Sequence, residues 1–350
     1  MQLIEFGYKE MGWTFHSVKG IPLTNLIVGK NSAGKSKFLH SLFIVTSFLR
    51  NILDISNAHF ESNMLFKDNE DNEIFFAFSV ENGQVIEEKL LYNGDIKITR
   101  DRTQSEIEGE PIKPPLNRLV LHVRRDVDRY PYLENIIGWS EQVCYLRFNE
   151  IELHPGNNTA ILFNNNKYAA YSMIKSLKDN WRERIIEQAK QLDYKITGID
   201  AVPISNEEQM VIAENGVNVP LLRSNMSRGM YRVLYILIFM EYSKQHGLPS
   251  ALLIDDFCEG LDFERAKIFG QILFDFCEEN HIQLFTTSND RFLMNTININ
   301  NWIILYRKQS EVENINKASH PHIFEKFSFT GLSNFDLFSS DFIEKQINNE

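Results

Sequence analysis

The segment at residues 29–36 constrains this chain of 350 residues more than any other. Its pattern is G-x-x-x-x-G-K-S, with Lys35 and Ser36 directly after the second glycine. An apolar run precedes it at residues 26–28, and apolar residues at helical spacing follow it at residues 37–45. The context therefore predicts a buried strand, a glycine-containing loop and a helix in direct succession.

Such a loop is suited to hold phosphate groups. Its glycines let backbone N–H groups point inward at phosphate oxygens, and the helix that follows adds the positive end of its dipole. We expect Lys35 to reach the β- and γ-phosphates of a nucleotide, and the Ser36 hydroxyl to contact Mg²⁺. A chance match in a loop is the alternative, which the flanking strand and helix disfavour. The residues expected to bind the nucleotide here are Gly29, Lys30, Asn31, Ser32, Ala33, Gly34, Lys35 and Ser36.

Composition and charge limit what the rest of the chain can be. With 43% hydrophobic and 24% charged residues, the sequence suits one large globular domain, with or without a sizeable insertion. The net charge of -11 counts against a broad DNA-binding surface, although a local basic groove is an open alternative. No apolar stretch is long enough for a membrane span, and no secretory signal pattern stands at the N-terminus. Together with three cysteines that lack metal-binding spacing, these features favour the cytoplasm.

Hydrophobic patterns predict elements along the whole chain. Two Asn-Gly turns, Asn82-Gly83 and Asn93-Gly94, are expected to join strands into an antiparallel meander. The helix after the phosphate loop is expected to reach about Asn57, and apolar residues at three- and four-residue spacing predict an amphipathic helix at 167–192. Residues 100–117 are polar and contain three prolines, which predicts an exposed loop. The expected strands are 1–8, 13–18, 24–28, 73–80, 85–92, 96–99, 119–123, 143–148, 194–204 and 209–213.

A further apolar strand, at residues 251–254, ends in two carboxylates, Asp255 and Asp256. A buried strand that presents an Asp at its carboxyl end is what a phosphate-loop site needs to hold Mg²⁺, and here that residue is Asp255. The next residue, Asp256, points differently and can orient the attacking water in hydrolysis. The alternative is a surface acidic pair after a core strand, which the phosphate loop upstream disfavours.

Residues 252–262 resemble, position for position, the Walker B and D-loop segment of ABC-type ATPase heads. Upstream, residues 225–232 resemble the signature motif of that family, with Ser227 and Gly229 in the matching places. Downstream, residues 282–289 resemble the strand and switch that follow in the family. Each motif alone, apart from the phosphate loop, is weakly specific, but the motifs stand in the order of the family.

The resemblance covers about residues 1–60 and 220–310. It implies an α/β fold, namely an ABC-ATPase head with a phosphate-loop α/β core, an antiparallel β subdomain and a helical insertion. The chain would then be a single domain with a discontinuous core, residues 1–100 and 195–350. Residues 101–194 would form the inserted lid or helical arm.

By resemblance, ABC-type heads hold two ATP molecules, each with Mg²⁺, between two copies of the chain. The physical reason is that the γ-phosphate concentrates negative charge, and donors from both chains can converge on it. Asp262 would lie across the seam of this homodimer. The residues implied for each site are Lys35, Ser36, Asp255 and Asp256 of one chain, with Ser227 and Gly229 of the other.

Two positions depart from the family pattern. The family's catalytic Glu is Asp256 here, and its switch histidine is matched by Ser288, which can bond to a γ-phosphate oxygen but cannot become a cation. Both changes predict slow hydrolysis. They favour a protein that uses ATP as a switch or clamp over one that works as a fast motor. Gln142 is a candidate for the Q-loop by residue type alone. Tyr8 or Trp13 is a candidate to stack on adenine, with packing in the core as the more common alternative.

Among ABC-type ATPases the chain is most similar to the soluble branch of RecF, SMC and OLD-like proteins, which includes the Septu- and PARIS-type ATPases of bacterial anti-phage systems. OLD proteins carry a nuclease domain after the ATPase, but here the residues after the switch show no paired-carboxylate metal pattern. The resemblance thus implies an ATPase subunit that controls an effector, a nuclease or toxin, on another chain. The alternatives are a RecF- or SMC-like ATPase that binds DNA directly, and a nucleotide-gated scaffold with negligible turnover.

Overall fold

Two β-sheets organise the chain, whose computed structural model describes residues 1–148, 169–204, 207–339 and 342. The strands of the larger sheet are β1 (Gln2–Glu10), β2 (Trp13–Lys19), β3 (Thr24–Val28), β4 (Phe60–Lys67), β5 (Glu73–Glu81), β6 (Gln84–Tyr92), β7 (Asp95–Arg100), β8 (Ser105–Ile107), β9 (Glu110–Pro111), β10 (Val143–Leu146), β14 (Ala251–Ile254), β15 (Gln283–Thr287), β16 (Trp302–Lys308) and β17 (Glu311–Ile315). Their order across the sheet is β10-β14-β15-β3-β16-β17-β2-β1-β4-β5-β6-β7-β8-β9. The smaller sheet consists of β11 (Ile196–Ile204), β12 (Glu207–Glu214) and β13 (Leu221–Leu222).

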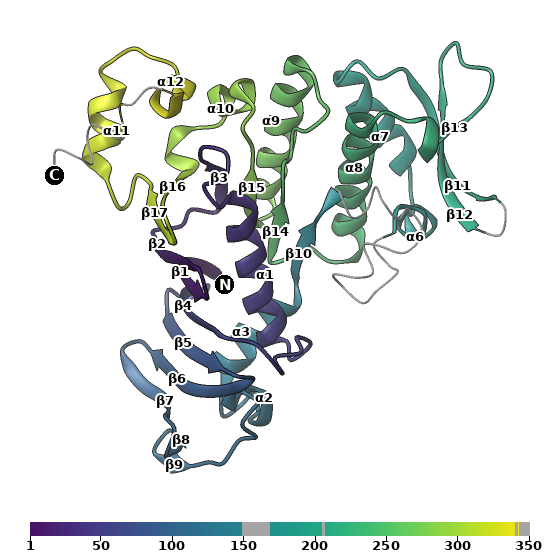
Figure 1. Ribbon diagram of the computed structural model, residues 1–350. Helices are drawn as coiled ribbons and strands as arrows, with labels where there is room; N and C mark the ends of the chain where they lie inside the picture. Colours follow the sequence, from purple (N-terminus) through teal and green to yellow (C-terminus); the bar gives the residue numbers. More distant parts are fainter. Residues whose placement is uncertain (149–168, 205–206, 340–341, 343–350) are drawn as a thin grey trace.

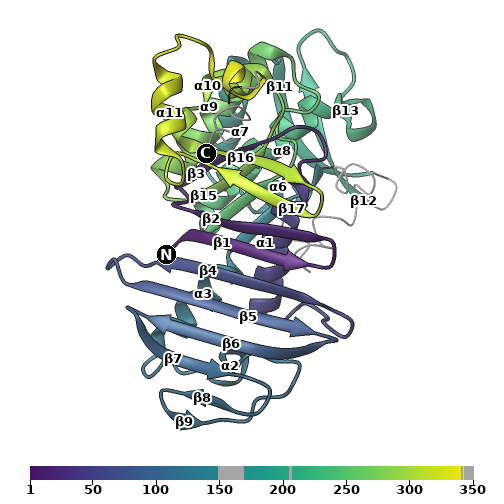
Figure 2. The ribbon, with the colours of Figure 1, turned by 60° about the vertical axis from the view of Figure 1, so that its left-hand side comes forward.

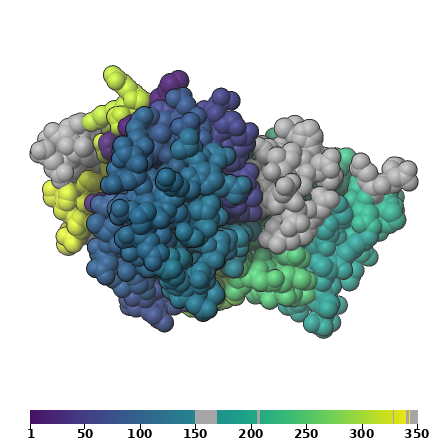
Figure 3. Space-filling model, turned by 90° about the horizontal axis from the view of Figure 1, so that it is seen from below, coloured from purple at the N-terminus to yellow at the C-terminus, as the bar shows by residue number. Residues whose placement is uncertain are grey.

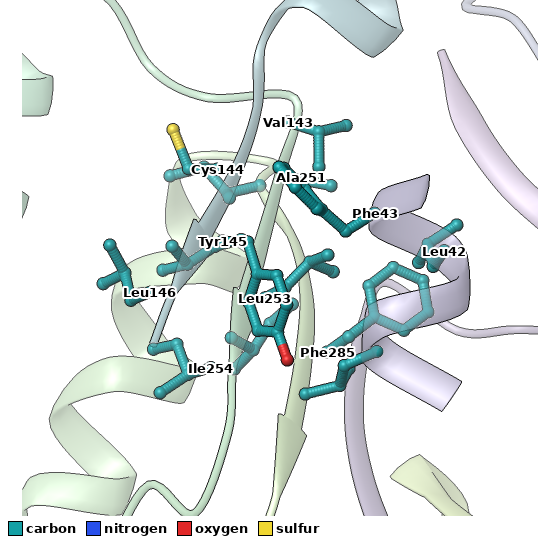
Figure 4. Packing of buried hydrophobic residues seen from close by; sticks show 14 of the residues in the cluster. Leu42, Phe43, Val143, Cys144, Tyr145, Leu146, Ala251, Leu253, Ile254 and Phe285 are labelled. Carbon is teal, nitrogen blue, oxygen red and sulfur yellow. The ribbon is translucent and has the colours of Figure 1, made fainter. Parts of the chain in front are cut away.

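The parallel half of the larger sheet forms the core. Strands β10, β14, β15, β3 and β16 run parallel to one another, and β14, β15 and β3 are buried along their whole length. A parallel sheet is covered on its faces, which is why such strands are nearly continuous runs of apolar residues. Helix α1 (Lys35–Leu49) packs against this half, and its Phe43 ring lies 5.4 Å from the ring of Tyr145 on β10 (Figure 4).

The antiparallel half of the larger sheet forms a lobe below the core (Figure 2). From β2 through β1, β4, β5, β6 and β7, each strand pairs antiparallel with the next. Both central residues have positive φ in the turn Asn82-Gly83, at 50° and 76°, and in the turn Asn93-Gly94, at 50° and 84°. This is the type I′ hairpin turn that Asn-Gly favours. The expected meander is therefore confirmed.

Some elements of this lobe differ from the expectation. Helix α1 ends well before Asn57, because Asn51 adopts a left-handed conformation with a φ of 56° and the chain then turns into β4, a strand that the sequence analysis missed. Residues 119–123 form helix α2 (Val120–Val123) instead of a strand, and the first N–H of this helix donates to the buried carboxylate of Glu88. The polar segment that was expected to be a loop contains β8 and β9.

A helical arm stands beside the core and the lobe (Figures 1 and 3). It comprises the smaller sheet with α6 (Ala170–Ser176), α7 (Trp181–Gln191) and α8 (Arg228–His246). The helix expected at 167–192 is two helices, separated by a turn in which Asp179 has a φ of 56°. Residues 149–168 of the expected insertion lie outside the described part of the chain. The arm therefore differs from the expected insertion, residues 101–194, at both ends. Strand β10 lies within that range but pairs with β14 in the larger sheet, whereas β11 to β13 lie beyond it but belong to the arm.

The remaining helices pack around the core and its edges. Helix α3 lies against α1, α9 lies against β15 and β3, and α12 lies against α10. Among the described residues, no helix combines the length and the apolar character that a membrane span needs. The bounds of these elements are α3 (Pro131–Glu141), α9 (Phe263–Glu279), α10 (Arg291–Thr296), α11 (Pro321–Ser328) and α12 (Asn334–Ser339), with the 3₁₀ turns η2 (Arg223–Asn225) and η3 (Ile299–Asn301).

Gly83 and Gly94 provide a matched test of the hairpin turns. A Cβ at Gly83 would lie 2.7 Å from the Ser56 carbonyl oxygen and 2.8 Å from that of Ile55, whereas one at Gly94 would have nothing within 4 Å. We expect Gly94→Ala to lower the free energy of unfolding by about 1–2 kcal/mol, the cost of a left-handed alanine. Gly83→Ala should cost about 1–3 kcal/mol more, because the neighbouring backbone must also move. Urea unfolding of both variants measures this difference, and equal costs would contradict the contact.

Candidate nucleotide-binding site

Three of the predicted motifs meet at one edge of the larger sheet. Strands β14, β15 and β3 are parallel neighbours, so their carboxyl ends lie side by side. The phosphate loop follows β3, the two aspartates follow β14, and Ser288 follows β15. Ligands of open α/β sheets bind outside the carboxyl ends of the strands. Gln142, in contrast, precedes β10 and stands at the opposite edge, where it cannot serve as a Q-loop residue for this site.

The phosphate loop curls directly into the start of α1. Gly34 caps the helix with a φ of 103°, and a Cβ there would lie 2.8 Å from the Trp13 ring, so only glycine fits this position. Lys35 is buried, and its ammonium group donates to the Gly29 carbonyl at 2.9 Å. Burial lowers the pKa of the Lys35 amine, although two neighbouring carboxylates act to raise it. The side chain of Lys35 therefore extends across the loop and is held at Gly29, the first residue of the loop.

Two hydroxyl groups converge on the carboxylate of Asp255. Ser36 Oγ donates to Asp255 Oδ1 at 3.0 Å, and Thr287 Oγ1 donates to the same oxygen at 2.7 Å. Mg²⁺ takes hard oxygen donors of this kind, and one or two carboxylates suffice when phosphates and waters complete its octahedron. The described residues contain no group of three or more His, Cys, Asp or Glu that could hold a metal by itself. The donor set therefore fits Mg²⁺ bound together with a nucleotide. Thr287 was not singled out from the sequence.

Asp256 has a left-handed backbone, with a φ of 47°. A residue other than glycine pays about 1–3 kcal/mol for such a conformation and keeps it where its surroundings fix it. Here its N–H donates to Thr287 Oγ1 at 2.8 Å, and its carbonyl accepts from Arg232 at 3.0 Å. Burial raises the pKa of its carboxyl group, as do the charges of Asp255 and Glu259. The backbone is thus fixed from both sides while the carboxyl group stays at the edge of the sheet.

Arg232 is a site residue whose role the sequence analysis missed. It is 1% exposed, and its guanidinium donates to the carbonyls of Asp256, at 3.0 Å, and Glu259, at 3.2 Å, and to Glu259 Oε2 at 2.6 Å. It also lies over the Phe148 ring, 5.2 Å from the centroid. The guanidinium therefore joins helix α8 to the turn that follows β14. The available signal was a lone arginine within the apolar run of residues 230–240.

The residues that resemble the signature motif and the D-loop form a second group, at the starts of α8 and α9. Ser227 is the N-cap of α8, and its hydroxyl accepts from the Met230 N–H at 3.2 Å. Asp262 is the N-cap of α9. Gly229 lies against Gly260 so closely that a Cβ at Gly229 would clash with the Gly260 carbonyl. Ser227 and Asp262 are both exposed, so this group presents polar atoms to solvent.

Two polar residues follow β15, where the family's switch stands. Ser288 is buried, and its hydroxyl accepts from the Asp290 N–H at 3.0 Å and is hydrogen-bonded to the side chain of Cys258. Asn289 is exposed, and its Nδ2 donates to Oδ1 of Asn31, in the phosphate loop, at 3.1 Å. The group that extends from this segment to the phosphate loop is therefore the side chain of Asn289.

The two aromatic candidates for contact with a base have different surroundings. Tyr8 is buried, and its ring is stacked on Phe60 with 5.9 Å between the centroids, so it packs in the core. Trp13 lies against the phosphate loop, stacked on Phe15 at 5.8 Å, and the Arg307 guanidinium lies 4.0 Å from its ring. Trp13 and Arg307 thus stand beside the loop, while Tyr8 does not.

A cavity of about 420 Å³ adjoins the phosphate loop on the side of β16. It is lined by loop residues 30–33, by residues 304–307 at the end of β16, and by Gln309 and Phe338, the last of which belongs to α12. The volume lies within the range of small-molecule sites, and the lining is mostly apolar with a few polar groups, which is typical of such sites. A nucleoside could therefore be accommodated next to the loop.

Comparison with solved structures shows the fold. An SMC head bound to the C-winged helix domain of ScpA matches over 90% of this chain and 97% of its own, with 12% identity and a TM-score of 0.52. An SMC head with an extended coiled coil, bound to the C-terminal domain of ScpA derived from Pyrococcus furiosus, matches over 93% and 99%, with 13% identity and a TM-score of 0.50. By sequence, neither a protein-family model nor a curated protein matches the chain. The chain thus has the ABC-ATPase head fold, as the motifs predicted.

Arg232 provides a test of the link between α8 and the site. In Arg232→Gln two backbone carbonyls and one carboxylate lose a buried charged donor, so we expect the free energy of unfolding to fall by about 2–4 kcal/mol. Lys244→Gln, an exposed change near the other end of the same helix, should cost less than about 0.5 kcal/mol. Urea unfolding of both variants measures the two costs. Similar values for both would show that the Arg232 bonds do not hold the turn after β14.

Proposed function

We propose that the chain binds ATP together with Mg²⁺ and hydrolyses it slowly. The observation that carries this proposal is the 3.0 Å contact between Ser36 Oγ and Asp255 Oδ1, at the point where the phosphate loop and the end of β14 meet. One oxygen belongs to the first turn of α1 and the other to the residue after β14, and atoms this close together can both contact one Mg²⁺. The ABC-ATPase head fold of the chain supports the same function.

Each residue of the site has a task in this proposal. The N-terminus of α1 and the Lys35 ammonium stabilise the negative charge of the phosphates. Ser36 and Asp255 would hold Mg²⁺, which supplies neutralising charge between the β- and γ-phosphates when it is bound. Asp256 orients the attacking water. Its side chain is one methylene shorter than a glutamate, and Ser288 supplies no positive charge, so slow turnover is expected.

We further propose that the base and ribose occupy the cavity next to the loop. The cavity begins at loop residues 30–33, so a nucleotide whose phosphates lie in the loop can extend into it without crossing another element. Arg307 lies over Trp13 and also lines the cavity, which gives the base a planar cationic neighbour.

The group on α8 and α9 supports an ATP-bound homodimer. Ser227 and Asp262 are exposed, and each caps a helix whose N-terminus carries the positive end of a dipole. A helix N-terminus with free N–H groups is a favourable partner for a γ-phosphate. We propose that the N-terminus of α8 contacts the ATP bound to a second copy, with Ser227 and Gly229 at the phosphate and Asp262 at the seam.

Mixing two inactive variants tests both the site and the dimer. Lys35→Ala and Ser227→Arg should each lower phosphate release by at least about 100-fold. The first removes a cation from both sites of a dimer, and the second replaces a small hydroxyl by a bulky side chain at both sites. An equimolar mixture should recover about a quarter of the wild-type rate, since half of the dimers are mixed and each mixed dimer has one intact site of two. Phosphate release is measured on each variant and on the mixture.

Two results would contradict the proposal in different ways. Phosphate release by Lys35→Ala at the wild-type rate would contradict the site assignment, whatever rate the mixture shows. If each variant is inactive and their mixture is inactive too, the site assignment stands, but the proposal that a second copy contributes to the site is contradicted. The single variant Asp255→Asn serves as an additional control, since its phosphate release should no longer respond to the Mg²⁺ concentration.

For the cell, we propose that the chain is an ATPase subunit of a bacterial anti-phage defence complex that controls a separate effector. This proposal rests on the resemblance of the motifs to OLD-like defence ATPases of Septu and PARIS type. The overall acidic charge of -11 favours a protein partner over DNA as the main ligand.

Native mass spectrometry of the complex tests this role. The chain is expressed with its neighbouring genes, none of which carries a tag, and is purified with and without ATP. We expect a nuclease or toxin to co-purify and its release to depend on ATP hydrolysis, so that Lys35→Ala retains it. A chain that is isolated alone and captures DNA when ATP is present would favour the SMC-like alternative instead.

A further inference from the structure

The residue pair after β15 differs from what the family pattern implies. Ser288, at the position of the family's switch histidine, is 3% exposed, and its hydroxyl is engaged with the Asp290 N–H and with Cys258. Asn289 is exposed and reaches Asn31 in the phosphate loop, with 3.1 Å between Nδ2 and Oδ1. Ser288 is thus anchored in the interior, whereas the side chain of Asn289 contacts the phosphate loop.

We infer that Asn289 is the residue with which this chain recognises the γ-phosphate of ATP and so distinguishes ATP from ADP. The inference rests on the proposed function and names a specificity-determining residue of the same site. It assigns to Asn289 a contact that the sequence alone assigned to Ser288.

The backbone around Asn289 is fixed on both sides. The Ser288 N–H donates to the Ile27 carbonyl of β3, and its hydroxyl is held in the interior. Asp290 is the N-cap of α10, where its carboxylate accepts the N–H groups of Phe292, at 2.9 Å, and Leu293, at 2.8 Å. Because its two neighbours are anchored, Asn289 holds its side chain at the phosphate loop without further support.

The chemistry of the amide suits a phosphate oxygen. A carboxamide carries two N–H donors, one more than the bond to Asn31 uses. A hydrogen bond to an ionised phosphate oxygen is roughly twice as strong as one between two neutral amides. The Asn31–Asn289 bond is exposed, so little is lost when a γ-phosphate replaces it. ADP offers no γ-phosphate, and with ADP the bond to Asn31 persists.

Nucleotide binding to single variants tests the inference. The probes are the non-hydrolysable β,γ-imido analogue of ATP and ADP, each with Mg²⁺, and calorimetry gives the two dissociation constants. Asn289→Ala should raise the constant for the analogue about tenfold and that for ADP less than about twofold. Asn289→Asp keeps the shape but places a carboxylate near the γ-phosphate, so its effect on the analogue should be larger still. Ser288→Ala should affect the analogue less than Asn289→Ala does.

The controls separate this inference from the proposed function. Asn215→Ala, an exposed asparagine in the arm, should change neither constant, and thermal melting checks that each variant is folded. If the wild-type chain binds neither nucleotide, the proposed function fails and the inference with it. If the wild-type chain prefers the analogue over ADP and Asn289→Ala keeps that preference, the site stands and Asn289 is not the residue that recognises the γ-phosphate.

Discussion

The hydrogen bonds that Asp255 Oδ1 accepts tie the ends of three strands together. One donor, Ser36, is 219 residues away in the chain and the other, Thr287, is 32 residues away. Both bonds require that β14 lie parallel to β15 and that β15 lie parallel to β3, in the register that pairs Leu253 with Phe285 and Phe285 with Asn25. A slip of one residue would turn the carboxylate to the other face of the sheet. The apolar burial of these strands therefore fixes the geometry of the polar site.

A strained backbone stands at the centre of this arrangement. Asp256 is left-handed, and its conformation is held by a hydroxyl of β15 and a guanidinium of α8. Strain of this kind is found at functional sites because a stable surrounding structure can fix a side chain where an unstrained turn would not place it. Thr287 contributes twice, since its one hydroxyl donates to Asp255 and accepts from the Asp256 N–H. The two aspartates are thus oriented by a single side chain of the neighbouring strand.

Contiguous patterns in the sequence predicted much of the fold and the main motifs of the site. The phosphate loop, the strand that ends in Asp255 and the Asn-Gly hairpins are local signals, and the structure has the corresponding elements. Thr287 and Arg232 were missed because their roles depend on contacts between separate elements. The short apolar run at 119–123 suits a helix or a strand equally by periodicity, and its bond to buried Glu88 selects the helix. The amphipathic pattern at 167–192 likewise contained no strong signal for the break near Asp179.

The placement of Arg232 has a consequence for how nucleotide binding reaches the arm. Helix α8 begins at the signature residues, packs against α6 and α7 of the arm, and is joined by Arg232 to the turn after Asp256. Close-packed helices move as rigid bodies because their interfaces tolerate little deformation. A shift of the turn therefore moves α8 or breaks these bonds. A ligand shifts an equilibrium only by its difference in affinity for the two states. In the dimer proposed above, the contact between ATP and a second copy would supply this difference, and α8 would transmit it to α6 and α7.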